Sequence, residues 1–541
     1  MIRNANQVYM DLGTVLRGGV EGWQEGLIWP TSVHDLPKIF TDLWEGYKRI
    51  IARCGDFEIQ RALLGSHLVP WELYQILVSV RNLQRVDELG RAPIVSSHSN
   101  LYSPLIEKSP LPGPLSFGKW RLERATLKRL LRHPANFYLS CKYNLPYRKL
   151  PALMKKENRR RVVALYKPVP LCEQFMSTLG NWVDVRLIST WFGENERLRL
   201  SEDLLRGIEW MGEDLASLFA EIAHCHGVEV GGEHLEHCKM IASTLLTRTA
   251  RDLAWIRQAL RREGALDYLG VSGTNYYSRI LSLVVQELGG TVTSFNHGGA
   301  SCRYIVDYSL PEFSTCTRFG VENTPCIKLF EKLFELFPRP LKNQIQFFSV
   351  NYDSYRTLWE SLRDRPPPSR VKRIMLMSHP YHGDFSHHCQ YPDPIKWDVE
   401  LRIIRQLQSA GYDVVYKPHP GGRYHTLRAD FLPLGVQVIS EPFEAVLDEA
   451  DAYVYYCTDS TTMASAVCTK KPIVFIDCGF EQWFDDPWEL FRKRAHVVSG
   501  GFDEDNRMTF DETALLHVLQ KTPEEPDEGF LKKYFFPDGA S

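Results

Sequence analysis

The sequence predicts an α/β fold with two Rossmann-like domains that face one another across a cleft, preceded by a mainly helical N-terminal region. Three observations support this prediction. The chain has 541 residues, which is enough for several domains. Short β-branched segments alternate with helical ones in both halves, a pattern typical of parallel sheets. A proline-rich segment at residues 365–370, RPPPSR, lies between the halves and is typical of an interdomain linker.

Residues 1–115 are predicted to be mainly helical, because apolar side chains recur near the helical period in DLPKIFTDLWEGYKRIIARC and WELYQILVSVRNLQRVDEL. Residues 116–364 are predicted to form the first Rossmann-like domain. Its expected strands are RVVALYKP, VDVRLIST, LDYLGVSG and TVTSFNHGG. Its expected helices are a long stretch at residues 201–262 and the segment NYYSRILSLVVQELGG.

Residues 371–541 are predicted to form the second Rossmann-like domain. Its expected strands are RIMLMSHP, YDVVYKPHP, VQVISE, AYVYYCTD and KPIVFIDC. Its expected helices are KWDVELRIIRQLQSAG, FEAVLDEA and STTMASAVCTK. Ligands of open parallel sheets bind beyond the carboxyl ends of the strands, so polar residues at those ends are the candidates for function.

Composition excludes several classes of protein. Apolar residues make up 44% of the chain and charged residues 24%, which excludes a disordered or fibrous protein. No apolar segment is long enough to span a membrane and the chain does not begin with a signal segment, so we expect a soluble, cytoplasmic protein. The 12 cysteines include no CxxC pair, which is typical of reduced thiols.

We expect no metal ion and no cofactor. The histidines and cysteines at residues 224–238 lack the spacing of a zinc site. The acidic triplet at residues 503–505 lies in a polar loop, where it is expected to be solvated. The glycine-rich motifs that bind dinucleotides or nucleoside triphosphates are missing from the sequence.

Residues 119–167 form a basic segment with 15 lysines and arginines and only two glutamates, although the whole chain has a formal net charge of −2. Such a segment can hold an anionic membrane surface or a phosphorylated acceptor, which would place the protein at the inner face of a membrane. It can equally be a solvated helical face. Nucleic acid is not an expected partner, because the chain has no recognisable nucleic-acid-binding motif.

Polar side chains follow two of the predicted strands. His297 ends TVTSFNH and precedes two glycines, so it could act as an acid, a base or a hydrogen-bond donor, or it could cap a turn. Ser378, His379 and Asp384 follow the strand RIMLM and lie in a loop with a proline-fixed turn. Both loops are therefore candidates for ligand contact.

Two further strand ends favour an anion. Lys417, His419 and Arg423 follow the strand YDVVY, and the intervening prolines fix their direction. Hydroxyl groups follow the strand AYVYYC and open a helix, where free amides also bind phosphate, although Asp459 or Ser460 could instead be a simple N-cap. The residues predicted to bind a nucleotide are Ser378, His379, Lys417, His419, Pro420, Arg423, Asp459, Ser460, Thr461 and Thr462.

These motifs resemble those of GT-B glycosyltransferases of bacterial surface and capsular polysaccharide assembly, of the Kdo-transferase and sialyltransferase type. His419-Pro420 is similar to the HP motif of the sialyltransferases, and Ser460-Thr461 to their serine-threonine motif, which bind the phosphate and ribose of a CMP-sugar. Thr458 to Thr462 is similar to the Thr-Asp-x-Ser-Ser pattern of CDP-glycerol glycerophosphotransferases, and FNHGG to the His-Gly element of related capsule proteins. The resemblance covers about residues 265–480.

The sequence departs from the sialyltransferases at the general base. Those enzymes carry an acidic pair followed by glycine in the N-terminal domain. Here Asp527-Glu528-Gly529 lies near the C-terminus instead, and Glu263 before Gly264 is a single acid. The candidates for catalysis are therefore His297, Glu263, Asp267, Asp384 and Glu322.

The resemblance implies transfer of a Kdo-like or sialic-acid-like sugar from a CMP-activated donor to a surface polysaccharide or glycolipid. The second domain would bind the nucleotide-sugar donor and the first domain the acceptor, without a metal ion. Two alternatives stay open. A CDP-glycerol or CDP-ribitol phosphotransferase would break the bond at phosphorus, and a non-catalytic polysaccharide-assembly protein would bind no nucleotide.

Overall fold

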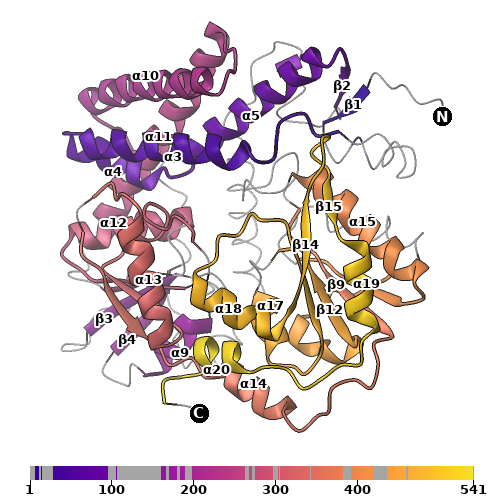
Figure 1. The fold of residues 1–541 in the computed structure, drawn as a ribbon. Helices are drawn as coiled ribbons and strands as arrows, with labels where there is room; N and C mark the ends of the chain where they lie inside the picture. Colours follow the sequence, from indigo (N-terminus) through magenta and orange to yellow (C-terminus); the bar gives the residue numbers. More distant parts are fainter. Residues whose placement is uncertain are drawn as a thin grey trace.

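The described residues of the computed structural model form two α/β units and a layer of helices (Figure 1). In Figure 1 the first unit lies on the left, the second on the right, and the helical layer above the first. The structure describes residues 7–10, 14, 28–95, 105–106, 160–165, 170–178, 183–188, 198–261, 267–270, 275–296, 303, 305–341, 343–381, 392–419, 435–457 and 461–539.

The first unit contains a six-stranded sheet with the order β4-β3-β5-β6-β7-β8. All neighbouring strands are parallel, so their carboxyl ends lie at one edge. The strands are β3 (Arg160–Leu165), β4 (Val183–Ile188), β5 (Asp267–Leu269), β6 (Val292–Phe295), β7 (Arg318–Val321) and β8 (Gln346–Ser349).

Helices cover both faces of this sheet. Consecutive side chains of a strand point to opposite faces, so neighbouring residues contact different helices. Phe348 lies 5.4 Å from Phe175 of α9 (Pro170–Thr178), whereas its neighbour Phe347 is stacked with Phe330 of α13 (Thr324–Leu336). A further helix, α12 (Tyr276–Glu287), packs on β5 and β6. The alternating aromatic side chains of β8 thus join two separate packing surfaces.

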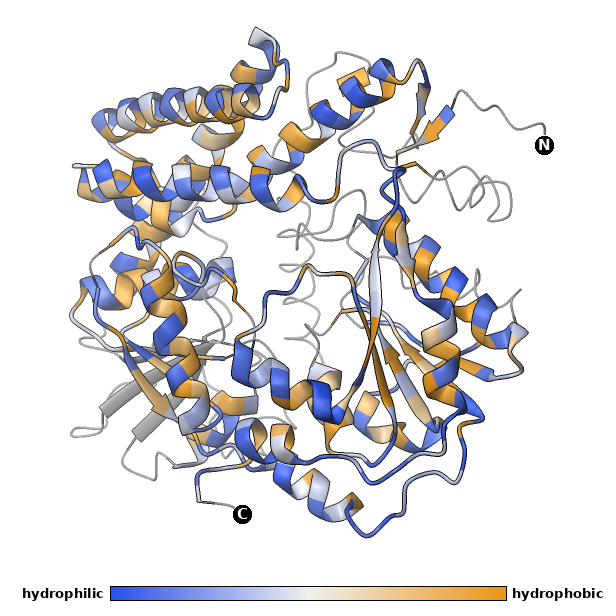
Figure 2. Cartoon of the chain, in the orientation of Figure 1, coloured by the Kyte–Doolittle hydropathy of each residue, from blue (hydrophilic) through white to orange (hydrophobic). Residues whose placement is uncertain are grey.

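The second unit contains a seven-stranded sheet with the order β11-β10-β9-β12-β13-β14-β15, parallel except for the β14–β15 pair. Its central strands are buried on both faces, which explains their uninterrupted apolar sequences (Figure 2). The strands are β9 (Arg373–Met377), β10 (Asp413–Lys417), β11 (Gln437–Val438), β12 (Ala452–Tyr455), β13 (Ile473–Asp477), β14 (His496–Phe502) and β15 (Met508–Phe510). Two separate, mainly parallel sheets confirm the predicted α/β fold class.

The segment FEAVLDEA, predicted as a helix, instead forms two short 3-10 turns, η6 (Phe443–Ala445) and η7 (Leu447–Glu449). Side chains from later in the sequence bond to carbonyl groups at the end of this segment. The Tyr453 hydroxyl donates to the Leu447 carbonyl at 2.9 Å, and Lys471 donates to the carbonyls of Leu447 and Ala450. The prediction of a helix here was therefore wrong.

The remaining helices of the second half surround its sheet and extend toward the first unit. They are α14 (Ser354–Leu362), α15 (Asp393–Ser409), α17 (Thr461–Val467), α18 (Asp485–Arg494), α19 (Glu512–Gln520) and α20 (Gly529–Phe535). Residues 365–370 connect α14 to β9 without helix or strand. The last helix, α20, packs against both α18 and α13, so the end of the chain returns to the first unit.

Two distant parts of the chain build the helical layer. The N-terminal part supplies α3 (Leu36–Arg53), α4 (Phe57–Gly65) and α5 (Val69–Glu88). The expected long helix at residues 201–262 is a hairpin of α10 (Glu202–Cys225) and α11 (Gly232–Arg261), which turns at Gly227 with a φ of 63°. Both of its helices pack on the N-terminal ones, so residues 116–364 contribute to two layers.

The N-terminal segment also reaches the second unit. A short parallel pair, β1 (Gln7–Tyr9) and β2 (Ala92–Ile94), lies above the end of the β14–β15 hairpin in Figure 1. The Trp29 amide donates to the Asp505 carbonyl at 2.9 Å, and Asn506 donates to the Trp29 carbonyl at 2.8 Å. Among the described helices, none combines the length and apolar character that crossing a membrane requires.

Candidate functional site

The structure describes about half of the residues predicted to form the site. Asp267, Ser378, His379, Lys417, His419, Thr461, Thr462 and Glu322 lie within the described residues. Glu263, His297, Asp384, Pro420, Arg423, Asp459 and Ser460, and most of the basic segment at residues 119–167, lie outside them.

Ser378 and Lys417 lie side by side at the carboxyl edge of the second sheet. Ser378 directly follows β9, and Lys417 is the last residue of the neighbouring strand β10. The Ser378 amide donates to the Lys417 carbonyl at 3.0 Å. Only 5% of the surface of Lys417 is exposed. Burial lowers the pKa of Lys417, whereas Glu444 and Glu441 raise it without forming an ion pair with it. A cation of this kind is suited to an anionic ligand that reaches the sheet edge.

Thr461 and Thr462 begin α17, directly beyond the neighbouring strand β12. Thr461 is exposed, and the Thr462 hydroxyl accepts a hydrogen bond of 3.5 Å from Tyr455, the last residue of β12. Glu444, which attracts Lys417, accepts a hydrogen bond of 2.8 Å from Ser465 of the same helix. The two predicted phosphate-binding segments thus share an edge, with a glutamate between them.

A buried hydrogen-bond network lies behind Ser378 and His379. Glu400 of α15 is fully buried and accepts hydrogen bonds from three tyrosines, each in or after a different strand. Tyr381 and Tyr416 contact one carboxylate oxygen at 2.6 and 2.8 Å, and Tyr456 contacts the other at 2.6 Å. We call these four residues, Glu400, Tyr381, Tyr416 and Tyr456, the tyrosine network.

The tyrosine network fixes the backbone that carries the candidate residues. The Tyr416 hydroxyl also contacts the Ser378 hydroxyl at 2.8 Å, and the His379 amide donates to the Tyr456 hydroxyl at 3.3 Å. Burial raises the pKa of Glu400, and the tyrosine hydroxyls lower it. Glu400 was not predicted from the sequence. The only sequence feature that points to it is that β9, β10 and β12 each have a tyrosine near or just beyond their carboxyl ends.

The carboxyl edge of the first sheet holds Asn296, after β6, and Glu322, after β7. The Asn296 amide donates to Glu322 at 2.9 Å, and both side chains are buried. Burial raises the pKa of Glu322, and Arg303 lowers it. Asp267 begins β5 and accepts a hydrogen bond from the Thr291 amide, so it lies at the opposite edge. The structure thus separates Asp267 from Glu322.

Arg303 joins the two units near these edges. Its guanidinium lies 3.9 Å from the centre of the Phe535 ring and donates to the Tyr534 carbonyl at 2.8 Å. Its own carbonyl accepts from the Phe484 amide at 3.1 Å, and the Ile305 amide donates to the Gln482 carbonyl at 2.6 Å. The segment that follows β13 therefore contacts Arg303 and Ile305, which lie between β6 and β7.

The acidic triplet forms a turn between β14 and β15. The Asp503 carboxylate accepts from the backbone amides of Asp505 and Arg507 at 3.0 and 2.8 Å. Within the described part of the chain, no group of three or more histidine, cysteine, aspartate or glutamate side chains is arranged to hold a metal ion.

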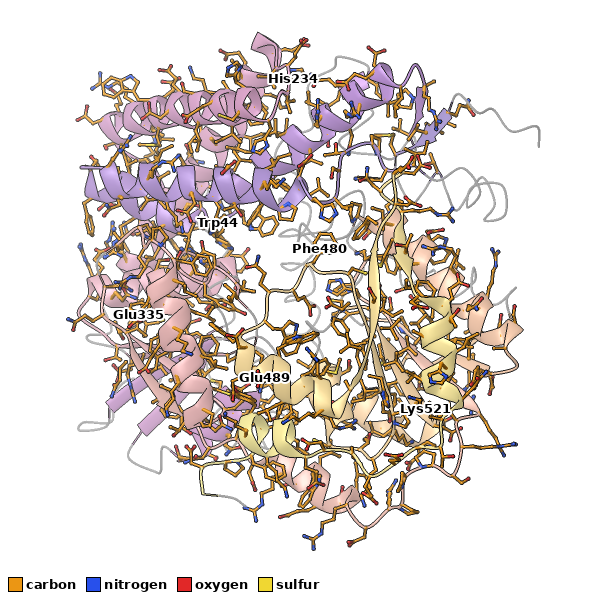
Figure 3. All side chains as sticks on the ribbon, viewed as in Figure 1. Trp44, His234, Glu335, Phe480, Glu489 and Lys521 are labelled. Carbon is orange, nitrogen blue, oxygen red and sulfur yellow. The ribbon has the colours of Figure 1, made fainter. Side chains whose placement is uncertain are left out.

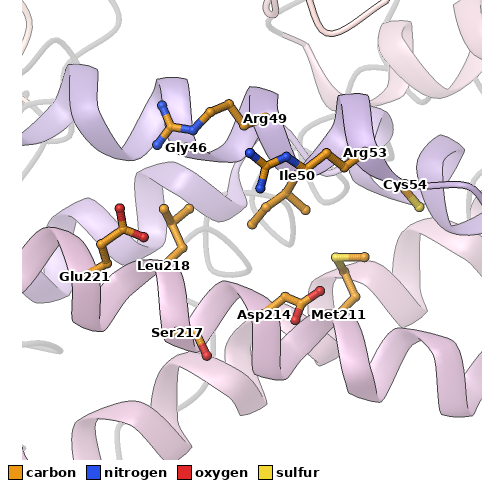
Figure 4. Close-up of a pocket in the computed structure, with 10 residues that line it drawn as sticks. All are labelled: Gly46, Arg49, Ile50, Arg53, Cys54, Met211, Asp214, Ser217, Leu218 and Glu221. Carbon is orange, nitrogen blue, oxygen red and sulfur yellow. The ribbon is translucent and has the colours of Figure 1, made fainter.

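A cavity of about 440 Å³ lies in the helical layer, between α3 and α10 (Figure 4). Arg49 and Arg53 of α3 line one side, and Asp214 and Glu221 of α10 line the other. Its floor is tightly packed, because a Cβ atom at Gly46 would lie 2.3 Å from the Leu218 side chain. None of the predicted site residues lines this cavity.

The fold and the strand-end residues define an α/β protein with two parallel sheets and a buried lysine at one carboxyl edge. Comparisons with known proteins add little detail. Neither a protein-family model nor a curated protein sequence matches the chain.

Solved structures match at low similarity. One is a Methanocaldococcus jannaschii UDP-GlcNAc 2-epimerase in complex with UDP-GlcNAc and UDP, at 13% identity and a TM-score of 0.35, covering 70% of this chain and 97% of the other. Another is a Polygonum tinctorium UDP-glucosyltransferase capable of glucosylating indoxyl, in complex with 3,4-dichloroaniline, at 10% identity and a TM-score of 0.33, covering 70% of this chain and 92% of the other.

Proposed function

We propose that the protein is a glycosyltransferase of GT-B type, with a nucleotide-activated sugar bound at the carboxyl edge of the second sheet. The donor is a CMP-activated sugar of the Kdo or sialic acid kind, and the acceptor is a surface polysaccharide or glycolipid. Ser378, His379, Lys417 and His419 contact the nucleotide, with Thr461 and Thr462 on its phosphate. His297 and Glu322 come from the first unit, toward the acceptor.

The observation that carries this proposal is the position of Lys417. A lysine is rarely buried without an ion-pair partner, and burial of its charge is unfavourable. Among the described residues, Lys417 forms no ion pair, and it lies at the sheet edge where nucleotides bind in open α/β proteins. A phosphate would supply such a partner in direct contact. In the transfer step, the departing nucleotide gains negative charge, and a fixed ammonium group stabilises that charge.

Thermal melting with CMP, CDP, UDP, GDP and ADP tests the proposal. Ligand at about 100 times its dissociation constant stabilises a folded protein by about 2.7 kcal/mol. We expect CMP to raise the melting temperature of the wild type. Lys417→Met should weaken CMP binding about 10-fold to 100-fold, because it removes one hydrogen bond to a charged group. Lys372→Met is the matched control, since Lys372 is exposed just before the other end of β9.

Each outcome leads to a different conclusion. Stabilisation by CMP that is lost in Lys417→Met supports the proposed donor, and sugar transfer from CMP-Kdo and CMP-sialic acid is then assayed. A response to CDP alone favours the alcohol-phosphate transferase, whose acceptor product gains phosphorus. Stabilisation by UDP or GDP would show that the donor sugar is activated by that nucleotide instead of CMP. No response to any nucleotide contradicts the proposal and favours a non-catalytic assembly protein.

A further inference from the structure

Three aromatic rings gather at the carboxyl edge of the second sheet. Phe480 follows β13, and Phe502 ends the neighbouring strand β14, with 5.0 Å between their ring centres. His34, from the segment before α3, stacks on Phe480 with 5.8 Å between ring centres and 18° between ring planes. It meets Phe502 edge-on. We call His34, Phe480 and Phe502 the aromatic cluster.

The aromatic cluster lies beside the predicted phosphate-binding segment. β12 and β13 are neighbouring parallel strands, so their carboxyl ends are about 5 Å apart. The Cys457 thiol, just beyond β12, contacts the Glu481 carboxylate at 3.4 Å, which holds the chain after Phe480 against the chain that leads to Thr461. Figure 3 shows Phe480 between the helical layer and the second sheet, facing the middle of the molecule.

The aromatic cluster is not part of a closed core. His34 is exposed, and Phe480 and Phe502 are half-buried. Its environment differs from that of Phe491, eleven residues after Phe480, which is fully buried and packs against Phe530. A half-buried aromatic ring at a ligand-binding edge offers its face to another flat ring. The imidazole of His34 already lies on Phe480 in this manner, so that face accepts a planar nitrogen heterocycle.

We propose that Phe480 is the stacking platform for the base of a nucleotide, and that the His34 imidazole and the base compete for its face. This inference rests on the proposed function, since it assumes that a nucleotide binds at this edge. The base would lie beyond β13 and β14, and its phosphate one to two strands away, near Thr461 beyond β12. Strands spaced by about 5 Å make this separation comparable to the length of a nucleoside monophosphate.

Calorimetric titration of the full chain tests the proposal, with two probes. The first probe is the tightest-binding nucleotide among CMP, CDP and UDP, and the second is ribose 5-phosphate, which has no base. Phe480→Leu should weaken nucleotide binding about 5-fold to 100-fold, the range of one base stacked on an aromatic ring. Its binding of ribose 5-phosphate should be unchanged. Phe480→Trp should retain nucleotide binding, because it retains an aromatic face.

His34→Ala should strengthen nucleotide binding, because it removes the competing ring. Phe57→Leu is the control for loss of an exposed phenylalanine, since Phe57 lies at the start of α4, 49% exposed. Equal nucleotide affinity in the wild type and Phe480→Leu overturns the inference, as does an equal loss of ribose 5-phosphate binding. If Lys417→Met still weakens nucleotide binding in that case, the proposed function stands. If the wild type binds no nucleotide, both proposals fail.

Discussion

Glu400 shows how a single buried carboxyl group can organise several strands. It accepts hydrogen bonds from the hydroxyl groups of Tyr381, Tyr416 and Tyr456, which lie in or beyond three neighbouring strands. Hydrogen bonds of this kind offset the cost of removing the carboxyl group from water. The same hydroxyls hold Ser378 and the His379 backbone. The shape of the sheet edge therefore depends on a residue of the helix beneath it.

Replacement of Glu400 by alanine should destabilise the second unit by about 3 kcal/mol or more, because three buried hydroxyls lose their acceptor. Glu400→Gln should cost less, since an amide oxygen still accepts hydrogen bonds. Differential scanning calorimetry measures both effects. Glu360→Ala is the control, because Glu360 is exposed on α14. Equal melting temperatures for Glu400→Ala and Glu360→Ala would refute the role of the network.

Glu322 predicts a specific dependence of stability on pH. Burial raises its pKa above the ordinary value of 4.5. The folded protein then holds this proton more tightly than the unfolded chain. Its contribution to stability is therefore complete below pH 4.5 and is lost as the pH rises through the folded-state pKa. Glu322→Gln has no such proton, and its amide oxygen still accepts from Asn296.

Melting temperatures of the wild type and Glu322→Gln, compared between pH 4 and pH 7, test this dependence. The wild type should lose stability relative to the variant as the pH rises. Glu360→Gln should follow the wild type at every pH. Parallel curves for the wild type and Glu322→Gln would show that Glu322 titrates at its ordinary value.

The site could be predicted from the sequence only in part. Strand-end position drew attention to Ser378 and Lys417, because a polar residue after an apolar run can be read from sequence alone. Glu400 could not be found this way. It lies in an ordinary helical segment, and its burial depends on tyrosines from separate strands. Asp267 carried a suitable side chain, but only the structure shows that it lies at the opposite edge from Glu322.

At the scale of elements, strand β7 has no room for a side chain at Gly320. A Cβ atom there would lie 2.6 Å from the Phe295 ring and 2.9 Å from the Phe348 ring. Both rings are packed against Phe175 of α9, so neither can move easily. The glycine lets β6, β7 and β8 share one layer of aromatic side chains.

Gly320→Ala should therefore lower stability by about 1–3 kcal/mol, as expected for an overfilled core. Gly501→Ala is the matched control in β14, where the nearest atom to an added Cβ is the Thr509 hydroxyl at 3.7 Å. That change should be neutral or slightly stabilising, because it reduces the freedom of the unfolded chain. Thermal melting of the two variants measures the difference, and equal melting temperatures would contradict it.

Elements with strong periodicity were predictable, whereas those set by tertiary contacts were not. The central strands β9, β10, β12 and β13 were predicted because both of their faces are apolar, whereas β14 and β15 were not predicted. The segment at residues 443–449 has helical composition but forms two 3-10 turns, and Tyr453 and Lys471 bond to its Leu447 carbonyl. Residues 201–262 were predicted as a long helical stretch, and the structure divides it into two helices at Gly227, which adopts a positive φ.

At the scale of the whole molecule, the C-terminal tail fastens the second half of the chain to the first. Asn323 is the centre of this contact. Its side-chain oxygen caps α13 by accepting from the Cys326 amide at 3.1 Å. Its side-chain nitrogen donates to the carbonyls of Lys533 and Phe536 at 3.1 and 2.8 Å. One residue thus both begins a helix and holds the tail.

Asn323→Asp separates these two roles, because a carboxylate still caps the helix but cannot donate to the tail. Loss of two hydrogen bonds should cost about 2 kcal/mol and expose the tail. Limited proteolysis should then cleave the tail about 10-fold faster or more, the factor that corresponds to 1.4 kcal/mol. Asn275→Asp is the matched control, since Asn275 caps α12 in the same way. Unchanged cleavage in Asn323→Asp would show that other contacts hold the tail.

The helical layer has a consequence for synthesis of the protein. Ser66 of the N-terminal helices bonds to Leu245 of α11, 179 residues further along the chain. A ribosome adds about 5–20 residues per second, so the apolar faces of α3, α4 and α5 are synthesised many seconds before α10 and α11, which pack on them. During that interval a nascent chain exposes the surface that chaperones recognise. Cotranslational folding of this protein therefore cannot begin with a complete N-terminal domain.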